Sequence, residues 1–241
     1  TFRSVDNFIN GHGPTWNIGE RVQTFTHPLW FFALSTAYAL TGEIFYTGIF
    51  LAWAVSLAAV LVMALRLAPA PGHAGLGIAL LCSSKAFVDY STSGLENPLS
   101  HLLLALFTAL YFHWQPTLRA LTLLALVAGL ATFNRMDTLL LYLPALGVGV
   151  WRLQDPRALG AVAIGFAPFI IWEFFSLCYY GFLFPNTAYG KLGTGIPATD
   201  LAQQGIYYLY NSLQVDPPTL VVIAAGAAGI CYASKRPQLP L

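Results

Sequence analysis

Long apolar runs, separated by short polar connections, make up most of this chain. Seven of these runs are about 16 to 23 residues long, close to the roughly 20 mostly apolar residues that an α-helix needs to cross a bilayer. The pattern therefore predicts an all-α bundle with about seven spanning helices. The runs cover residues 44–66, 75–91, 95–113, 118–133, 137–152, 158–180 and 218–234.

A shorter apolar run, from Pro28 to Leu40, precedes the bundle. It falls short of a spanning length by roughly seven residues, and proline suits the first turn of a helix. We therefore predict a juxtamembrane or re-entrant helix that does not cross the membrane. Upstream, apolar residues at helical spacing between Arg3 and Asn10 predict a short amphipathic helix. Residues 1–43 then form a first outer loop, and residues 44–241 form the bundle, with a second outer loop at 181–217.

Composition narrows the class of protein. Charged residues make up 9% and hydrophobic residues 57% of the chain, whereas soluble domains carry about 25% charged residues. This balance indicates an all-α polytopic membrane protein, and no basic tract points to nucleic acid. The cysteines lie inside apolar runs, so free thiols are expected. His12 and His27 lack metal-ligand spacing. We therefore predict no metal site and no cofactor, and a role for a divalent ion stays open.

The distribution of basic residues predicts the orientation of the bundle. If the helix at 28–40 does not cross, one set of connections is short, basic and nearly free of acids. The positive-inside rule makes that side cytoplasmic and the opposite side extracytoplasmic. We expect a multi-pass protein of the plasma (inner) membrane, with its polar motifs on the extracytoplasmic side. The basic residues of the cytoplasmic set are Arg66, Arg119, Arg152, Arg157, Lys235 and Arg236.

Several polar residues on the predicted outer side are candidates for a pocket. Ionisable groups at membrane depth are costly, so they are usually paired or functional. Arginine offers a planar fork to a phosphate and lysine a compact charge, and a nearby carboxylate can act as a general base. Pairing between neighbours, such as Arg135 with Asp137 or Lys85 with Asp89, explains the same charges without a function. The pocket candidates are Arg3, His27, Lys85, Glu96, Arg135, Asp137, Asn186 and Lys191.

Four polar segments, in order along the chain, resemble the motifs of one enzyme class. They read FRSVDNFINGHGPTWNIGERVQTFTHPLW, SGLENPL, NRMD and YYGFLFPNTAYGK. These segments are similar to membrane glycosyltransferases of the GT-C class, in particular the mycobacterial terminal arabinofuranosyltransferases and their bacterial homologues. The resemblance runs through most of the chain, and its first and last segments are the most specific.

The resemblance implies a GT-C-like helix bundle that acts in bacterial cell-wall biosynthesis. It implies transfer of a sugar, with arabinofuranose as a candidate, from a polyprenyl-phosphate donor to a cell-envelope glycan at the outer face of the membrane. The family's catalytic aspartate matches a position just before Thr1, so we expect that residue, the first spanning helix and a further C-terminal part outside this chain. Asp6 is the fallback base. Arg135 and Lys191 match charged motif positions and are assigned to the donor phosphate.

Two other functions fit the same sequence features. A transporter or flippase for a lipid-linked substrate would also carry intramembrane charges, but no internal hydropathy repeat is visible in the seven runs. A non-catalytic subunit of an envelope-synthesis complex would also lack the aspartate, provided that the residues upstream of Thr1 lack it too. No spacing in the sequence identifies the sugar or the acceptor.

Overall fold

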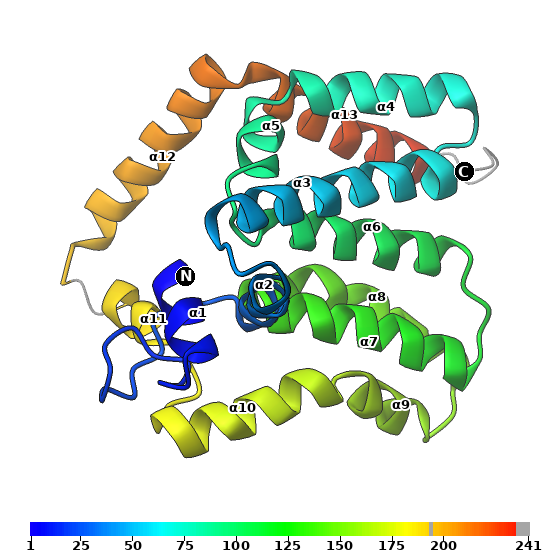
Figure 1. Cartoon of the computed structure of the whole chain (residues 1–241). Coiled ribbons are helices and arrows are strands. Elements are labelled where there is room, and N and C mark those ends of the chain that lie inside the picture. The colour runs from blue at the N-terminus through cyan, green and yellow to red at the C-terminus, as the bar shows by residue number, and fades with distance from the viewer. Residues whose placement is uncertain (193–194, 235–241) are drawn as a thin grey trace.

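The protein is a bundle of helices, and the computed structural model describes residues 1–192 and 195–234. That part of the chain contains helices and no strands (Figure 1), which confirms the predicted all-α class. The elements are α1 (Phe2–Ile9), α2 (Pro28–Thr41), α3 (Phe45–Val62) with its π-helical extension η1 (Met63–Leu67), α4 (Pro71–Ser83), α5 (Lys85–Ser91), α6 (Asn97–Phe112), α7 (Leu118–Asn134), the 3₁₀ turn η2 (Met136–Thr138), α8 (Leu139–Leu153), α9 (Ala158–Gly165), α10 (Ala167–Tyr180), α11 (Asn186–Leu192), α12 (Ala198–Val215) and α13 (Pro217–Ser234).

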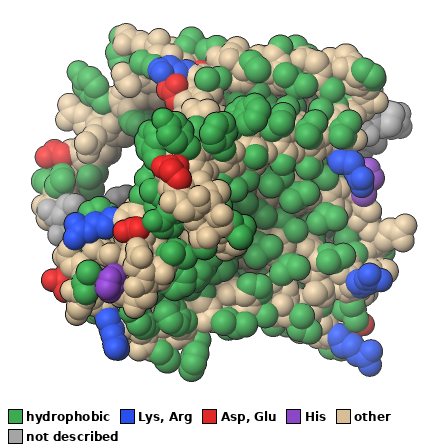
Figure 2. All heavy atoms as spheres, in the orientation of Figure 1, with side chains coloured by type: hydrophobic (Ala, Val, Ile, Leu, Met, Phe, Trp, Pro, Cys, Tyr) green, Lys and Arg blue, Asp and Glu red, His purple; other side chains and the backbone are tan. Residues whose placement is uncertain are grey.

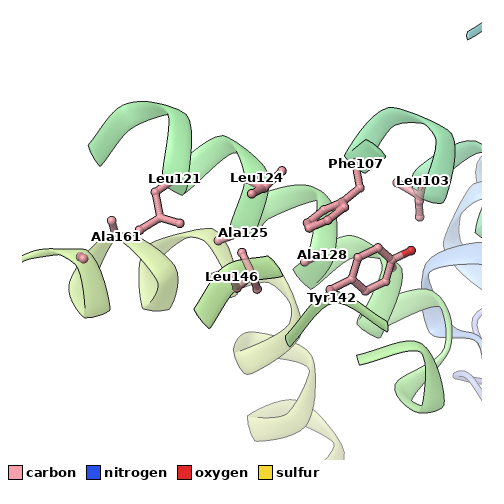
Figure 3. Packing of buried hydrophobic residues seen from close by; sticks show 11 residues of the cluster. Leu103, Phe107, Leu121, Leu124, Ala125, Ala128, Tyr142, Leu146 and Ala161 are labelled. Atoms are coloured by element: carbon pink, nitrogen blue, oxygen red, sulfur yellow. The ribbon is translucent and has the colours of Figure 1, made fainter. Parts of the chain in front are cut away.

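Helix α7 forms the centre of the bundle and packs against α6, α8, α9 and α10. Its buried face carries Leu121, Leu124, Ala125 and Ala128, which meet Phe107 and other side chains of the neighbouring helices (Figure 3). The small residues at 125 and 128 allow this close contact, because helices in a membrane associate mainly through side-chain packing.

A second core lies under the first outer loop and is mostly aromatic. Phe25 stacks on Phe31 with ring centroids 4.3 Å apart, and Trp172 of α10 packs edge-on against Phe32 at 5.6 Å. Val5 of α1 is fully buried in the same cluster. The amphipathic spacing predicted for the start of the chain therefore has a partner, because the apolar face of α1 rests on α2.

Helix α2 lies across the bundle. In Figure 1 it is seen nearly end-on, whereas α3, α6 and α7 run across the view. It has 14 residues and buries Trp30, Phe31 and Leu34 against its neighbours. Both features agree with the predicted non-crossing helix, which remains a prediction.

The bundle has an apolar middle and two charged ends. Figure 2 shows hydrophobic side chains over the middle of this face, with Lys, Arg, Asp and Glu gathered toward its ends. The connections after α3, α6 and α8 lie at the end opposite α2 (Figure 1). Arg157 lies in the last of these connections, and Arg66, Arg119 and Arg152 lie in the helical turns next to them. The predicted basic side is therefore one end of the molecule. Lys235 and Arg236 lie outside the described residues.

Within the described part of the chain, two helices are long and apolar enough to cross a membrane, Phe45–Leu67 and Met136–Leu153. Two bent helix pairs, α9 with α10 and α12 with α13, raise the number to up to four if each pair counts as one span. The α6 and α7 helices are apolar but shorter. The predicted count of about seven spans therefore remains a prediction.

Two runs predicted as single helices are broken in the structure. The run 75–91 is interrupted at Ser84, whose extended backbone ends α4 and whose hydroxyl accepts the N–H of Phe87 to cap α5. The run 158–180 is bent by 59° at Phe166. Pro168 lies in the first turn of α10, where its missing N–H is tolerated, whereas in the middle of a continuous helix it would break a hydrogen bond.

The closest helix contact is between α7 and α9. A Cβ at Gly165 would lie 2.5 Å from Ala125 Cβ and 2.7 Å from the Leu126 backbone nitrogen. The small residues Gly226 and Gly229 of α13 could allow equally close packing, with a lipid-facing helix as the alternative. A Cβ at either of these glycines would meet no atom within 4 Å, so the described residues favour the alternative.

Candidate active site

Four of the candidate residues meet at the end of the bundle where α2 lies. His27 Nδ1 is 3.4 Å from Glu96 Oε2, and Arg135 Nη1 donates to Glu96 Oε1 at 3.3 Å. Arg135 also binds Asp137 in a fork, with Nη2 to Oδ2 at 2.7 Å and Nε to Oδ1 at 3.0 Å. His27 of the first loop thus shares one polar cluster with residues of the two middle motifs that lie 69 or more positions further along the chain.

The Glu96 carboxylate is held by the turn that precedes α6. Gly94 adopts φ +70°, a conformation that favours glycine, and its carbonyl accepts the Trp30 indole N–H at 2.9 Å. The Glu96 carbonyl accepts Asn134 Nδ2 at 3.2 Å. Glu96 is only 8% exposed. A buried carboxylate requires partners, which His27 and Arg135 supply.

Arg135 follows the last residue of α7, where the backbone turns extended. Its side chain is 37% exposed, compared with 66% for the Asp137 side chain. A guanidinium has five N–H donors. Three of them point to Glu96 and Asp137, so two remain for a ligand. One positive and two negative groups give this trio a net charge of −1 when both carboxyl groups are ionised.

His27 connects the cluster to the start of the chain. Its imidazole is buried, with Nε2 2.7 Å from Thr1 Oγ1 and Nδ1 facing Glu96. Burial lowers the pKa of His27, and the Glu96 carboxylate opposes this shift. The imidazole is therefore neutral near pH 7, so it can accept one hydrogen bond and donate another.

A cavity of about 270 Å³ opens beside the cluster. Its walls come from the first loop, from the segment after α7 and from the segment that leads into α11. The residues that line it are Thr26, Arg135, Met136, Asp137, Phe184, Pro185, Thr187 and Ala188. An arginine and an acid at its mouth, with mostly apolar walls, suit an amphiphilic ligand that carries polar groups.

The last motif holds the first loop in place. The Tyr180 hydroxyl donates to the Pro14 carbonyl at 2.7 Å, and the Asn186 N–H donates to the Gln23 carbonyl at 3.3 Å. The Arg21 guanidinium lies 5.1 Å from the centre of the Tyr179 ring. Two segments more than 150 residues apart in the sequence are thereby fixed against each other.

The remaining predicted site residues lie apart from the cluster or beside it. The exposed Lys85 pairs with Asp89, Arg3 stacks on Trp16, and the Asp6 carboxylate accepts the Tyr38 hydroxyl. Local partners therefore account for all three. Asn186 lies between two residues of the cavity wall, donates its backbone N–H to the Gln23 carbonyl and is exposed. Lys191 lies in α11, and its side chain is outside the described part of the structure.

Sequence reasoning overlooked Glu173 of α10. Its Oε1 atom is buried and has no hydrogen-bond partner among the described residues. The sequence contained a sign of its importance, because Glu173 is the one acidic residue in the apolar run 158–180. Among residues 1–192 and 195–234, no group of three or more His, Cys, Asp or Glu residues could hold a metal ion.

Comparisons with known proteins identify two relatives. The chain is 30% identical over 232 residues to the terminal beta-(1→2)-arabinofuranosyltransferase of Mycobacterium tuberculosis. This alignment covers 87% of the chain and 36% of the Mycobacterium protein. It is 27% identical over 276 residues to the protein of the same name from Corynebacterium glutamicum, covering 99% of the chain and 38% of that protein. No family model matches the chain, and no solved structure matches it significantly.

These alignments leave much of the relatives unmatched. The chain spans a little over a third of the length of either relative. The alignments nevertheless cover 87% and 99% of this chain. Over most of its own length, the chain therefore resembles the terminal arabinofuranosyltransferases of mycobacteria and corynebacteria.

Proposed function

We propose that this chain forms the donor-binding part of a membrane glycosyltransferase that builds a cell-wall glycan. The observation that carries the proposal is Arg135, fixed by Glu96 and Asp137 at the mouth of the cavity with two N–H groups unused. The similarity to arabinofuranosyltransferases supports arabinofuranose as the sugar and an outer-face glycan as the acceptor.

In the proposed reaction, a base removes the proton from an acceptor hydroxyl. The oxygen attacks the anomeric carbon, the bond from that carbon to the phosphate oxygen breaks, and prenyl phosphate leaves. Arg135 stabilises the negative charge on the departing phosphate, and Lys191 of α11 is assigned to the same role. By the same resemblance, we assign the base to a position just before Thr1. The contact of Thr1 Oγ1 with His27, at 2.7 Å, supports a base at the edge of the cluster.

Transfer of labelled sugar by the full-length protein tests this function. The protein should move label from a prenyl-phosphate sugar to an oligosaccharide acceptor in detergent or liposomes. Movement of intact, lipid-linked donor across liposomes without transfer would instead identify a transporter or flippase. If the full-length protein lacks an acid just before Thr1 and shows no transfer, the non-catalytic subunit becomes the better interpretation.

Asp137→Asn is expected to strengthen binding of prenyl phosphate by roughly threefold to tenfold. Asp137 occupies two donors of Arg135, its side chain is 66% exposed, and its charge repels a phosphate. Calorimetric or fluorescence titration of the full-length protein measures the change. Asp89→Asn, which removes an exposed acid from another ion pair, should leave affinity unchanged. Weaker binding in Asp137→Asn would contradict the phosphate role of Arg135.

Both ends of α2 are expected to face outward. Gly19 precedes the helix and Glu43 follows it, and both residues are exposed. On a background in which Cys82, Cys178 and Cys231 are replaced, a single cysteine at 19 or at 43 should react with an impermeant maleimide added outside the cell. Labelling at one position alone would show that α2 crosses the membrane, and would separate the first loop from the predicted outer side.

A further inference from the structure

Glu173 is a half-buried acid that the proposed reaction does not yet use. It lies in the middle of α10, between Trp172 and Phe174. Its Oε1 atom is buried and accepts no hydrogen bond from the described residues. Burying a carboxyl oxygen without a partner costs free energy, and acids within apolar helices commonly mark functional positions.

The recess in front of Glu173 adjoins the donor cavity. It is lined by residues of α10, of the end of α7 and of the first loop, including Gln23 and Thr132. The recess and the donor cavity share three lining residues, Thr26, Met136 and Pro185. The two spaces are therefore neighbours, separated by these residues. The recess measures about 10 Å³. This is close to the space that one water molecule or one hydroxyl group requires, and far less than a sugar ring requires.

Glu173 thus lines a narrow recess whose other lining residues are mostly apolar, and its Oε1 atom has no partner among the described residues. A sugar hydroxyl is both a donor and an acceptor, so it can donate to the free Oε1 atom. Arg135 lies on the far side of the shared wall and faces the larger cavity. A ligand whose phosphate contacts Arg135 can direct a hydroxyl of the attached sugar toward Glu173, provided that Met136 or Thr26 shifts to open the wall.

We propose that Glu173 is a specificity-determining residue that binds a hydroxyl of the donor sugar. This inference rests on the proposed function, because it needs the donor phosphate at Arg135. The proposal assigns different chemical roles to Arg135 and Glu173. Arg135 binds the phosphate of any prenyl phosphate, whereas Glu173 distinguishes a donor that carries the sugar from one that does not.

Binding of two probes to the full-length protein tests the inference. One probe is a prenyl-phosphate sugar, and the other is the same prenyl phosphate without sugar. Glu173→Ala is expected to weaken binding of the first probe about tenfold, as loss of one buried hydrogen bond does, and to leave the second unchanged. Glu173→Gln, which keeps an acceptor oxygen of the same size, should retain most of the affinity. Phe174→Ala truncates the exposed neighbour on α10 and serves as the matched control.

The outcomes separate this inference from the proposed function. Equal loss for both probes, or no loss for either, would overturn the role of Glu173 while leaving the phosphate site in place. If the wild-type protein binds neither probe, the donor site itself is absent and both proposals fail. Thermal unfolding of each variant shows whether it is folded. If Glu173→Ala does not fold, Glu173→Leu, which has a similar size but no acceptor oxygen, replaces it in the same comparison, and a folded Leu variant that binds both probes as tightly as the wild type overturns the role of Glu173.

Discussion

Replacing Arg135 with alanine should reduce sugar transfer by the full-length protein at least a hundredfold. The variant loses the positive group that is proposed to neutralise the leaving phosphate, and removal of one such donor typically costs a factor of 10² to 10³ in rate. It also leaves the Glu96 carboxylate without a cationic partner, next to the neutral imidazole of His27. Breaking a buried pair by removing one partner costs about 3–5 kcal/mol, an upper bound here because the Arg135 side chain is 37% exposed.

A second variant separates the loss of phosphate stabilisation from the loss of a charged partner for Glu96. Arg135→Lys keeps a positive charge for Glu96 but loses the planar fork that binds two carboxylate oxygens and a phosphate together. We expect this variant to retain most of the thermal stability and to show intermediate transfer rates. Arg152→Ala removes an exposed arginine at the opposite end of the bundle and is the matched control. Full activity in a folded Arg135→Ala protein would exclude the assigned phosphate contact.

Gly165→Ala should lower the free energy of unfolding by about 2–3 kcal/mol. The added methyl group would lie 2.5 Å from Ala125 Cβ and 2.7 Å from the Leu126 backbone nitrogen. Neither neighbour is the end of a flexible side chain, so α7 and α9 would have to move apart. Overpacking of this kind costs about 1–3 kcal/mol. Because α7 also carries Asn134 and leads into Arg135, we expect transfer to fall with stability.

Gly160 offers a control within the same helix. A Cβ at Gly160 would meet no atom within 4 Å, and alanine favours a helix by up to about 1 kcal/mol relative to glycine. Gly160→Ala should therefore unfold at the same temperature as the wild type or slightly higher. Thermal unfolding in a mild detergent compares the two variants. Equal midpoints for both would contradict the close contact between α7 and α9.

The pattern of apolar residues was sufficient to identify the helices, because each helix must bury or expose a long apolar surface whatever its neighbours are. It located α1 and α2 close to their observed bounds. It did not locate the breaks at Ser84 and Phe166. Those breaks depend on a capping hydroxyl and on a proline at a helix start, which act through local hydrogen bonds that hydropathy does not measure.

The sequence by itself determined which polar residues could form a site, since few charged side chains interrupt the apolar runs. Only the tertiary structure decided which of them meet. Local partners keep Lys85, Arg3 and Asp6 away from the cluster, whereas Glu96 is turned toward His27 and Arg135 by the Gly94 turn and the Trp30 hydrogen bond. The physical reason is that a buried charge is stable only where folding brings it a partner, and the partners of Glu96 come from segments distant in the sequence.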